Sequence, residues 1–105
     1  MDSLALARFF SDFLSKYGGS KVEILSSKNS KIFNNMVVCT ACDNYNAQLL
    51  LVDLLDYAKL EFGLINCGLE GYKKGDWIIV DFDKVFVHIF TEKARTKYNI
   101  EKLWR

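Results

Sequence analysis

WIIVDFDKVFVHIF, residues 77–90, is the segment that decides the fold of this chain. Two runs of β-branched and aromatic residues flank a short polar turn at Asp83 and Lys84, which is typical of a β-hairpin. Turns of two and of four residues predict the same register. The expected opposing pairs are Val80 with Val87, Ile78 with Ile89, Asp81 with Phe86, Ile79 with His88, and Trp77 with Phe90.

This register divides the hairpin into two unlike faces. One face is wholly apolar, as a core beneath a helix requires. Its residues are Ile78, Val80, Phe82, Val85, Val87 and Ile89. The opposite face, the outer hairpin face, combines aromatic residues with an acid and an imidazole. Its residues are Trp77, Ile79, Asp81, Phe86, His88 and Phe90. Such a mixture suits a partly wet protein interface, and it equally suits a face covered by another helix.

A helix and two strands are expected before the hairpin. Apolar residues at helical spacing predict a helix from about Leu4 to Tyr17, and Gly18–Gly19 supplies its end. Strands are predicted at Lys21–Leu25 and Met36–Thr40, on either side of the polar stretch Ser26–Lys31. We expect the two strands to be neighbours in one sheet.

A second helix is expected between these strands and the hairpin. Asp43 or Asn44 is a plausible N-cap, and Gly63 follows the predicted last residue, Phe62. Leucines occur on nearly every side of this helix. We therefore expect it to be buried against the sheet or against a second copy of the chain.

The remaining segments complete an α/β (α+β) architecture. Leu64–Cys67 is predicted as a short strand, Gly68–Asp76 as a loop, and Thr91–Trp104 as a final helical stretch. Helices mixed with both hairpin and crossover connections indicate a mixed β-sheet flanked by helices. With 105 residues, the chain is expected to form a single domain, residues 1–105.

Composition favours a protein partner over nucleic acid or membrane. The formal net charge is +1 and 26% of residues are charged, so no strong global field attracts anionic surfaces. The most apolar run, Leu49–Leu55, is interrupted by Asp53 and is far shorter than the roughly 20 residues of a membrane span. The N-terminus lacks the features of a signal peptide, so the expected location is the bacterial cytoplasm.

Metal or redox chemistry is the first alternative weighed. Cys39 and Cys42 have the spacing of a redox or metal pair, but a zinc site needs two further ligands. Only Cys67 and His88 remain as donors. We therefore expect Cys39 to finish a buried strand, Cys42 to lie in the following turn, and no metal or cofactor to be bound.

A nucleotidyltransferase-like enzyme is the second alternative. Asp81 and Asp83 are close enough in sequence to suggest a magnesium site, yet one is expected on a strand and the other in a turn. No glycine-rich phosphate loop precedes them. His88 has no nucleophile motif nearby, and a hydrogen bond from His88 to Asp81 is the expected role of its imidazole. The residues thus predict a protein that is not an enzyme.

The last third of the chain resembles a known family. The segment GLEGYKKGDWIIVDFDKVFVHIFTEKARTKYNIEKLW, residues 68–104, is similar to the C-terminal half of the ribosomal silencing factors, the Iojap-like proteins. The shared markers are Glu70, Gly71, Trp77, Asp81, Val87, His88, Arg95, Tyr98, Glu101, Leu103 and Trp104. Upstream, MVVCTA at residues 36–41 resembles the family strand more weakly.

The resemblance implies a fold similar to the nucleotidyltransferases and a homodimer when the protein is free. It also implies binding to the large ribosomal subunit through its fourteenth protein. There the factor would sterically block joining with the small subunit and so repress translation.

Carried over residue by residue, the resemblance marks Trp77, Asp81 and His88, which all fall on the outer hairpin face. Tyr72 in the adjacent loop is a further candidate contact. The predicted partner-binding residues are Tyr72, Trp77, Ile79, Asp81, Phe86, His88 and Phe90. A minor contact with ribosomal RNA is a weaker hypothesis, because a cluster of basic residues usually forms only a solvated helix face. It rests on the basic residues Arg95, Lys97, Lys102 and Arg105.

Overall fold

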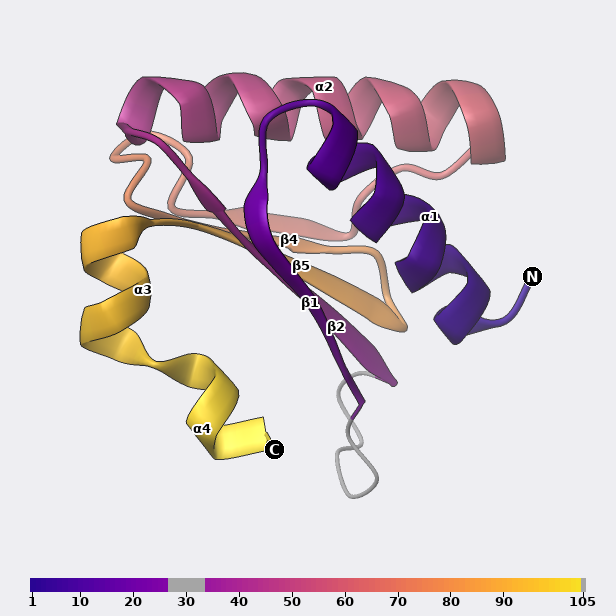
Figure 1. Ribbon diagram of the computed structural model, residues 1–105. Coiled ribbons are helices and arrows are strands. Elements are labelled where there is room, and N and C mark those ends of the chain that lie inside the picture. The colour runs from indigo at the N-terminus through magenta and orange to yellow at the C-terminus, as the bar shows by residue number, and fades with distance from the viewer. Residues whose placement is uncertain (27–33, 105) are drawn as a thin grey trace.

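The computed structural model describes residues 1–26 and 34–104, which form a five-stranded sheet with helices on both sides (Figure 1). The strands are β1 (Ser20–Ser26), β2 (Asn35–Ala41), β3 (Gly68–Glu70), β4 (Trp77–Asp81) and β5 (Val85–Thr91). The helices are α1 (Ser3–Lys16), α2 (Asn44–Phe62), α3 (Glu92–Tyr98) and α4 (Ile100–Trp104). Most of the polar stretch predicted at Ser26–Lys31 lies outside the described residues.

The sheet is mixed, which confirms the predicted fold class. Its strand order is β1-β2-β5-β4-β3. Only the central pair, β2 with β5, runs parallel, whereas the other neighbours are antiparallel. A parallel pair needs a crossover connection, and α2 lies within it. The likeness to nucleotidyltransferases stays a prediction.

The main core lies between the sheet and the pair α1 and α2, which cover the same face (Figure 1). The apolar hairpin residues point into it as predicted, and Ile78, Val80, Val87 and Ile89 are fully buried there. From the helices, Phe10, Leu14, Leu51 and Leu54 fill the same space. Burying each such side chain contributes about 1.5–3 kcal/mol, so this face supplies most of the driving force for folding.

Helix α2 is buried on one side only. Asp43 caps it by accepting a hydrogen bond from the Asn46 backbone N–H at 2.8 Å, and Gly63 ends it in the left-handed conformation. Leu50, Leu51 and Leu54 face the sheet, which confirms one of the two expected packing modes. The opposite side of the helix leaves Tyr45, Leu49, Val52 and Leu60 exposed.

Two predicted elements were wrong. The short strand is Gly68–Glu70 and not Leu64–Cys67, because pairing with β4 begins where Gly68 faces Asp81. The final helical stretch is also not continuous. Asn99 adopts a left-handed conformation with φ 41° and separates α3 from α4. Asparagine tolerates that conformation better than most residues, so the break costs little.

A second, smaller core lies on the other face of the sheet, beneath α3 and α4. Its buried residues are Leu25, Met36, Val38, Phe90, Ala94 and Ile100, with Trp77 and Phe86 packed against them. The outer hairpin face therefore contributes directly to this core. Its accessibility depends on how much of it α3 and α4 leave open.

Candidate functional site

The hairpin has the predicted register in full. All five expected pairs, from Trp77 opposite Phe90 to Asp81 opposite Phe86, are observed. The turn holds two residues between Phe82 and Val85, with the Phe82 N–H donating to the Val85 carbonyl at 2.9 Å. The alternation of side chains then follows from the pleat, and the outer hairpin face forms one contiguous surface.

Trp77 is the centre of an aromatic cluster on this surface. Its ring centroid lies 5.1 Å from that of Phe90, 6.0 Å from that of His88 and 4.6 Å from that of Tyr98 in α3. Trp77 is half-buried, and Tyr98 is 43% exposed. The cluster thus has a buried base and an accessible edge, which is the shape of an aromatic anchor at an interface.

The polar partner of His88 differs from the prediction. Its Nδ1 accepts a hydrogen bond from the Trp77 indole N–H at 2.9 Å, and no hydrogen bond to Asp81 forms. Asp81 instead accepts from the Asp83 backbone N–H at 2.6 Å, because the turn brings that donor within reach of its carboxylate. The expected His88–Asp81 pair is therefore wrong.

The protonation of His88 follows from this geometry. An Nδ1 that accepts a hydrogen bond carries no proton, so the neutral ring has its proton on Nε2. That atom is buried and has no hydrogen-bond partner among the described residues. Burial lowers the pKa of His88 to about 4, so the imidazole stays uncharged at neutral pH. The ring thus orients Trp77 and adds no charge to the surface.

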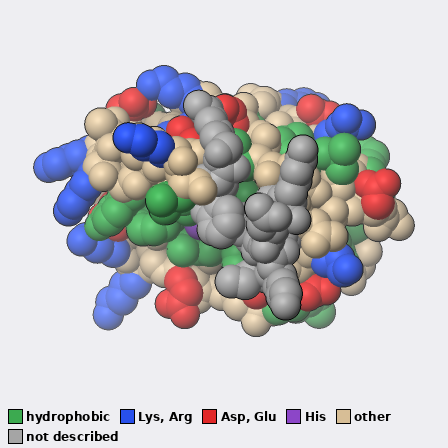
Figure 2. Space-filling model, turned by 90° about the horizontal axis from the view of Figure 1, so that it is seen from below, with side chains coloured by type: hydrophobic (Ala, Val, Ile, Leu, Met, Phe, Trp, Pro, Cys, Tyr) green, Lys and Arg blue, Asp and Glu red, His purple; other side chains and the backbone are tan. Residues whose placement is uncertain are grey.

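Part of the outer hairpin face is closed. Phe90 is fully buried beneath α3 and α4, and His88 is 4% exposed, so neither side chain is free to touch a partner. Their assignment as direct contacts is corrected to a supporting role beneath Trp77. The half-buried residues Ile79, Asp81 and Phe86 remain accessible beside it. Figure 2 shows the molecule from below, with apolar side chains bordered by both basic and acidic ones.

Tyr72 lies in a loop that is fixed by α2. The Gln48 side-chain amide donates to the backbone carbonyl of Tyr72 at 2.8 Å, and Asn44 donates to the carbonyl of Lys74 at 2.9 Å. Gly71 adopts a φ of 81°, and a Cβ there would lie 2.0 Å from the Trp77 carbonyl oxygen. The loop backbone is thus held against β4. The Tyr72 side chain is 40% exposed, as a contact residue requires.

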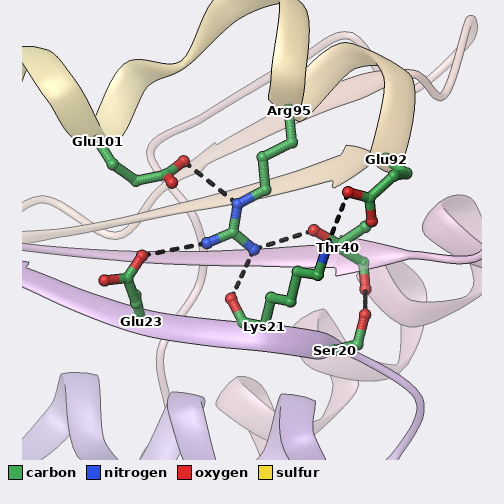
Figure 3. Close-up of polar contacts among 7 residues, drawn as sticks. All are labelled: Ser20, Lys21, Glu23, Thr40, Glu92, Arg95 and Glu101. Atoms are coloured by element: carbon green, nitrogen blue, oxygen red, sulfur yellow. Dashed lines mark hydrogen bonds and ion pairs between the residues drawn. The ribbon is translucent and has the colours of Figure 1, made fainter.

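Arg95 does not lie on the surface, contrary to the RNA-contact hypothesis. It is 8% exposed, and its guanidinium joins four acceptors (Figure 3). These are Glu101 at 3.2 Å, Glu23 at 3.3 Å, the Thr40 hydroxyl at 2.9 Å and the backbone carbonyl of Lys21. Arg95 therefore clamps α3 and α4 to β1 and β2.

The other basic residues of the tail have different positions. Lys97 and Lys102 are exposed, and the Lys97 ammonium lies 5.3 Å from the centroid of the Tyr98 ring. Arg105 lies outside the described residues. Of the basic residues named for the RNA contact and described by the structure, Lys97 and Lys102 are exposed and Arg95 is buried.

The cysteines occupy the predicted positions. Cys39 is buried within β2 and Cys42 follows the strand end, where it is exposed. Burial raises the pKa of Cys39 to about 12, so it is a protonated thiol and a poor metal ligand or nucleophile. Among the described residues, no group of three or more His, Cys, Asp or Glu side chains is placed to hold a metal ion.

No helix among the described residues is long and apolar enough to span a bilayer.

Comparisons with known proteins find similarity over the whole chain. The family model described as "Ribosomal silencing factor during starvation" matches residues 1–105. A protein of Haemophilus influenzae named ribosomal silencing factor RsfS is 31% identical over 102 residues, covering 96% of this chain and 99% of the relative. A crystal structure of a Chromobacterium violaceum protein superposes with a TM-score of 0.92 at 30% identity, covering 99% and 87% of the two chains.

A more distant similarity is confined to a short segment. The mouse protein named "Mitochondrial assembly of ribosomal large subunit protein 1" is 39% identical over 36 residues, which is 34% of this chain and 16% of that protein.

Proposed function

Because this chain belongs to the ribosomal silencing factor family, whose members associate with ribosomes and are not enzymes, we propose that it binds the large ribosomal subunit and blocks joining with the small subunit. The contact on the ribosome is the fourteenth protein of the large subunit. We propose the bacterial cytoplasm as its location, because that is where bacterial ribosomes act. The name of the mouse relative, which refers to large-subunit assembly, supports the choice of subunit.

The surface that carries this proposal is the accessible edge of the outer hairpin face. Trp77 is held in one orientation by its hydrogen bond to His88 and by stacking on Phe90. Ile79 lies two residues along β4 on the same face, and Tyr72 follows Gly71, whose backbone packs against the Trp77 carbonyl. A tryptophan ordered before binding loses little conformational entropy on association, which is the property of an interface hot spot.

Silencing by this route is steric and reversible. The factor needs no catalytic group, because it acts by occupying space that the small subunit requires. Its strength follows mass action, so a free concentration one hundred times its dissociation constant opposes joining by about 2.7 kcal/mol. That corresponds to roughly a hundredfold loss of apparent affinity between the subunits.

The test uses a surface variant matched by a control on the other side of the molecule. Tyr72→Ala with Ile79→Ala removes accessible area next to Trp77 and leaves the stacked core in place. Tyr45→Ala with Leu60→Ala removes a tyrosine and an aliphatic side chain from the exposed side of α2, where they are 67% and 81% exposed. Both variants are first checked for folding by circular dichroism.

Each protein is then sedimented with purified ribosomal subunits on a sucrose gradient, and subunit joining is followed by light scattering. We expect the wild type and the α2 control to travel with the large subunit and to reduce joining. The Tyr72/Ile79 variant should do neither. A wild type that travels with neither subunit would overturn the proposed partner, and loss of binding only in the α2 control would move the contact to α2. A pull-down with the isolated fourteenth protein tests the specific partner.

Two finer proposals follow from exposed residues. We propose a homodimer for the free protein, supported by the apolar side chains of Leu49 and Val52 that α2 leaves exposed, and sedimentation equilibrium tests it. A minor contact of Lys97 and Lys102 with ribosomal RNA is tested by the salt dependence of large-subunit binding. Neutralising both lysines should reduce the slope of log K against log salt, and an unchanged slope would rule the contact out.

A further inference from the structure

Helices α1 and α2 cover the face of the sheet opposite to the outer hairpin face (Figure 1), and residues of both line a small pocket there. This aromatic notch has a volume of about 330 Å³. Its lining residues are Asp12, Phe13, Lys16, Tyr17, Tyr57 and Glu61. The volume lies at the small end of the range for ligand pockets, so it suits one side chain of a partner rather than a large cofactor.

The floor of the notch is a column of aromatic rings. Phe13 stacks on Tyr57 with ring centroids 4.3 Å apart, and the ring centroid of Tyr17 lies 4.7 Å from that of Phe13. Tyr17 is 54% exposed, which is unusual for a ring that could have packed inward. The column is built from both helices, so its shape is fixed by their packing.

The rim of the notch is negatively charged. Asp12 projects from α1 and Glu61 from the last turn of α2, and neither forms an ion pair with another described residue. Glu61 lies at the negative end of the α2 dipole, where an acidic residue costs stability. Burial raises the pKa of Tyr57, and the nearby charges of Glu61 and Asp12 add to that rise. These charges have no stabilising partner within the described chain.

One cationic group of the chain already lies beside the notch. The ammonium of Lys16 lies 5.4 Å from the centroid of the Tyr17 ring, within the range of a cation–π contact. One ammonium against two carboxylates still leaves a net negative charge. The site therefore has room and charge for one further cationic group.

We propose that the aromatic notch binds the cationic side chain of an arginine in a basic protein segment. A guanidinium is planar, so it can lie against the exposed rings, and its several N–H groups can reach two carboxylates at once. RNA does not fit this site, because Asp12 and Glu61 repel phosphate. The two sides of the sheet could then be occupied at the same time, one by the large subunit and the other by a basic partner.

The experiment is a titration of the isotope-labelled whole chain followed by amide NMR. The probes are four small molecules: acetyl-Gly-Arg-Gly-amide, its lysine analogue, its citrulline analogue and adenosine monophosphate. Citrulline has the shape of arginine without the charge, and the nucleotide represents RNA. We expect the arginine peptide to shift the amides of Phe13, Tyr17 and Tyr57 in a saturable way, at millimolar concentration.

Two variants separate the notch from general charge. Asp12→Asn with Glu61→Gln removes the rim charges, whereas Asp53→Asn with Asp56→Asn removes two exposed acids elsewhere on α2. Two exposed ion pairs together are worth roughly a tenfold change in affinity, so the first variant should bind the arginine peptide about tenfold more weakly. The control should bind it like the wild type.

Each outcome decides the proposal. Saturable shifts with the arginine peptide that exceed those with the lysine peptide and weaken in the rim variant support it, whereas equal binding of the lysine peptide would overturn the choice of arginine. Equal binding of citrulline, preference for adenosine monophosphate, absence of shifts in the notch, or unchanged binding in the rim variant would each overturn it. The readout does not involve ribosomes, so its failure is distinct from failure of the proposed silencing function.

Discussion

Replacing Arg95 with alanine should detach the C-terminal helices from the sheet. The substitution removes hydrogen bonds to Glu101, Glu23, the Thr40 hydroxyl and the Lys21 carbonyl. Removing one partner of a buried ion pair usually costs 3–5 kcal/mol. The Glu23 side chain is 37% exposed and can be rehydrated, whereas that of Glu101 is 15% exposed. We therefore expect the free energy of unfolding to fall by about 3 kcal/mol, near the lower limit of that range.

Urea unfolding monitored by circular dichroism measures this loss directly. For a domain of this size, about 3 kcal/mol corresponds to a fall in Tm of roughly 12 °C. Arg95→Lys is the matched control, because it keeps the charge and loses the planar fork. Arg95→Lys should lower the free energy of unfolding by about 1–2 kcal/mol. A double-mutant cycle with Glu101→Gln should give a coupling energy of about 1 kcal/mol.

A small effect would refute this reasoning. If Arg95→Ala costs less than about 1 kcal/mol, the guanidinium is not the clamp that its contacts indicate. The second readout is partner binding, since α3 carries Tyr98 against Trp77. Under conditions where the variant is still folded, we expect weaker binding to the large subunit together with faster amide exchange in α3. Unchanged exchange in α3 would show that other contacts hold the helix.

Three further predictions concern the core, the loop and the imidazole. Leu54→Ala should cost about 3 kcal/mol in urea unfolding, because Leu54 is fully buried between α2 and the sheet, and a loss below about 1 kcal/mol would contradict that packing. Gly71→Ala should cost about 2 kcal/mol and weaken large-subunit binding, since its Cβ would collide with the Trp77 carbonyl oxygen in a left-handed backbone; wild-type stability would show that the loop relaxes freely. His88 is neutral in the fold with a pKa near 4, below its unfolded value of about 6.5, so its stabilising contribution is complete above pH 6.5 and declines as pH falls toward 4. Relative to His88→Gln, the wild type should lose about 3 kcal/mol between pH 7 and pH 4, and a pH-independent difference, or an NMR titration midpoint near 6.5, would contradict the burial of the ring.

The hairpin could be predicted from the sequence in detail because strand pairing has a period of two. Once the turn was placed at Asp83 and Lys84, every opposing pair followed, and all are observed. The ends of α2 were predictable for a similar local reason, since the Asp43 cap and the Gly63 stop act on backbone atoms a few residues away.

The wrong predictions concern features that depend on contacts between residues far apart in the sequence. The position of β3 depends on where the chain meets the edge of β4, which residues 64–70 do not encode by themselves. The buried state of Arg95 depends on acceptors from residues 21, 23 and 40, more than 50 positions away in the sequence. Composition assigns an arginine to the surface by default, and only tertiary contacts can reverse that assignment.

The sequence by itself determined the elements, the two unlike faces of the hairpin and the resemblance to a family, because these depend on local periodicity and on residue identity. Only the tertiary structure decided which half of the outer hairpin face is open. Phe90 and His88 have the same alternation as Ile79 and Asp81, yet the first pair is buried, with α3 and α4 over Phe90, and the second pair is only half-buried. The physical reason is that pleating sets the direction of a side chain, whereas its exposure depends on what packs above it.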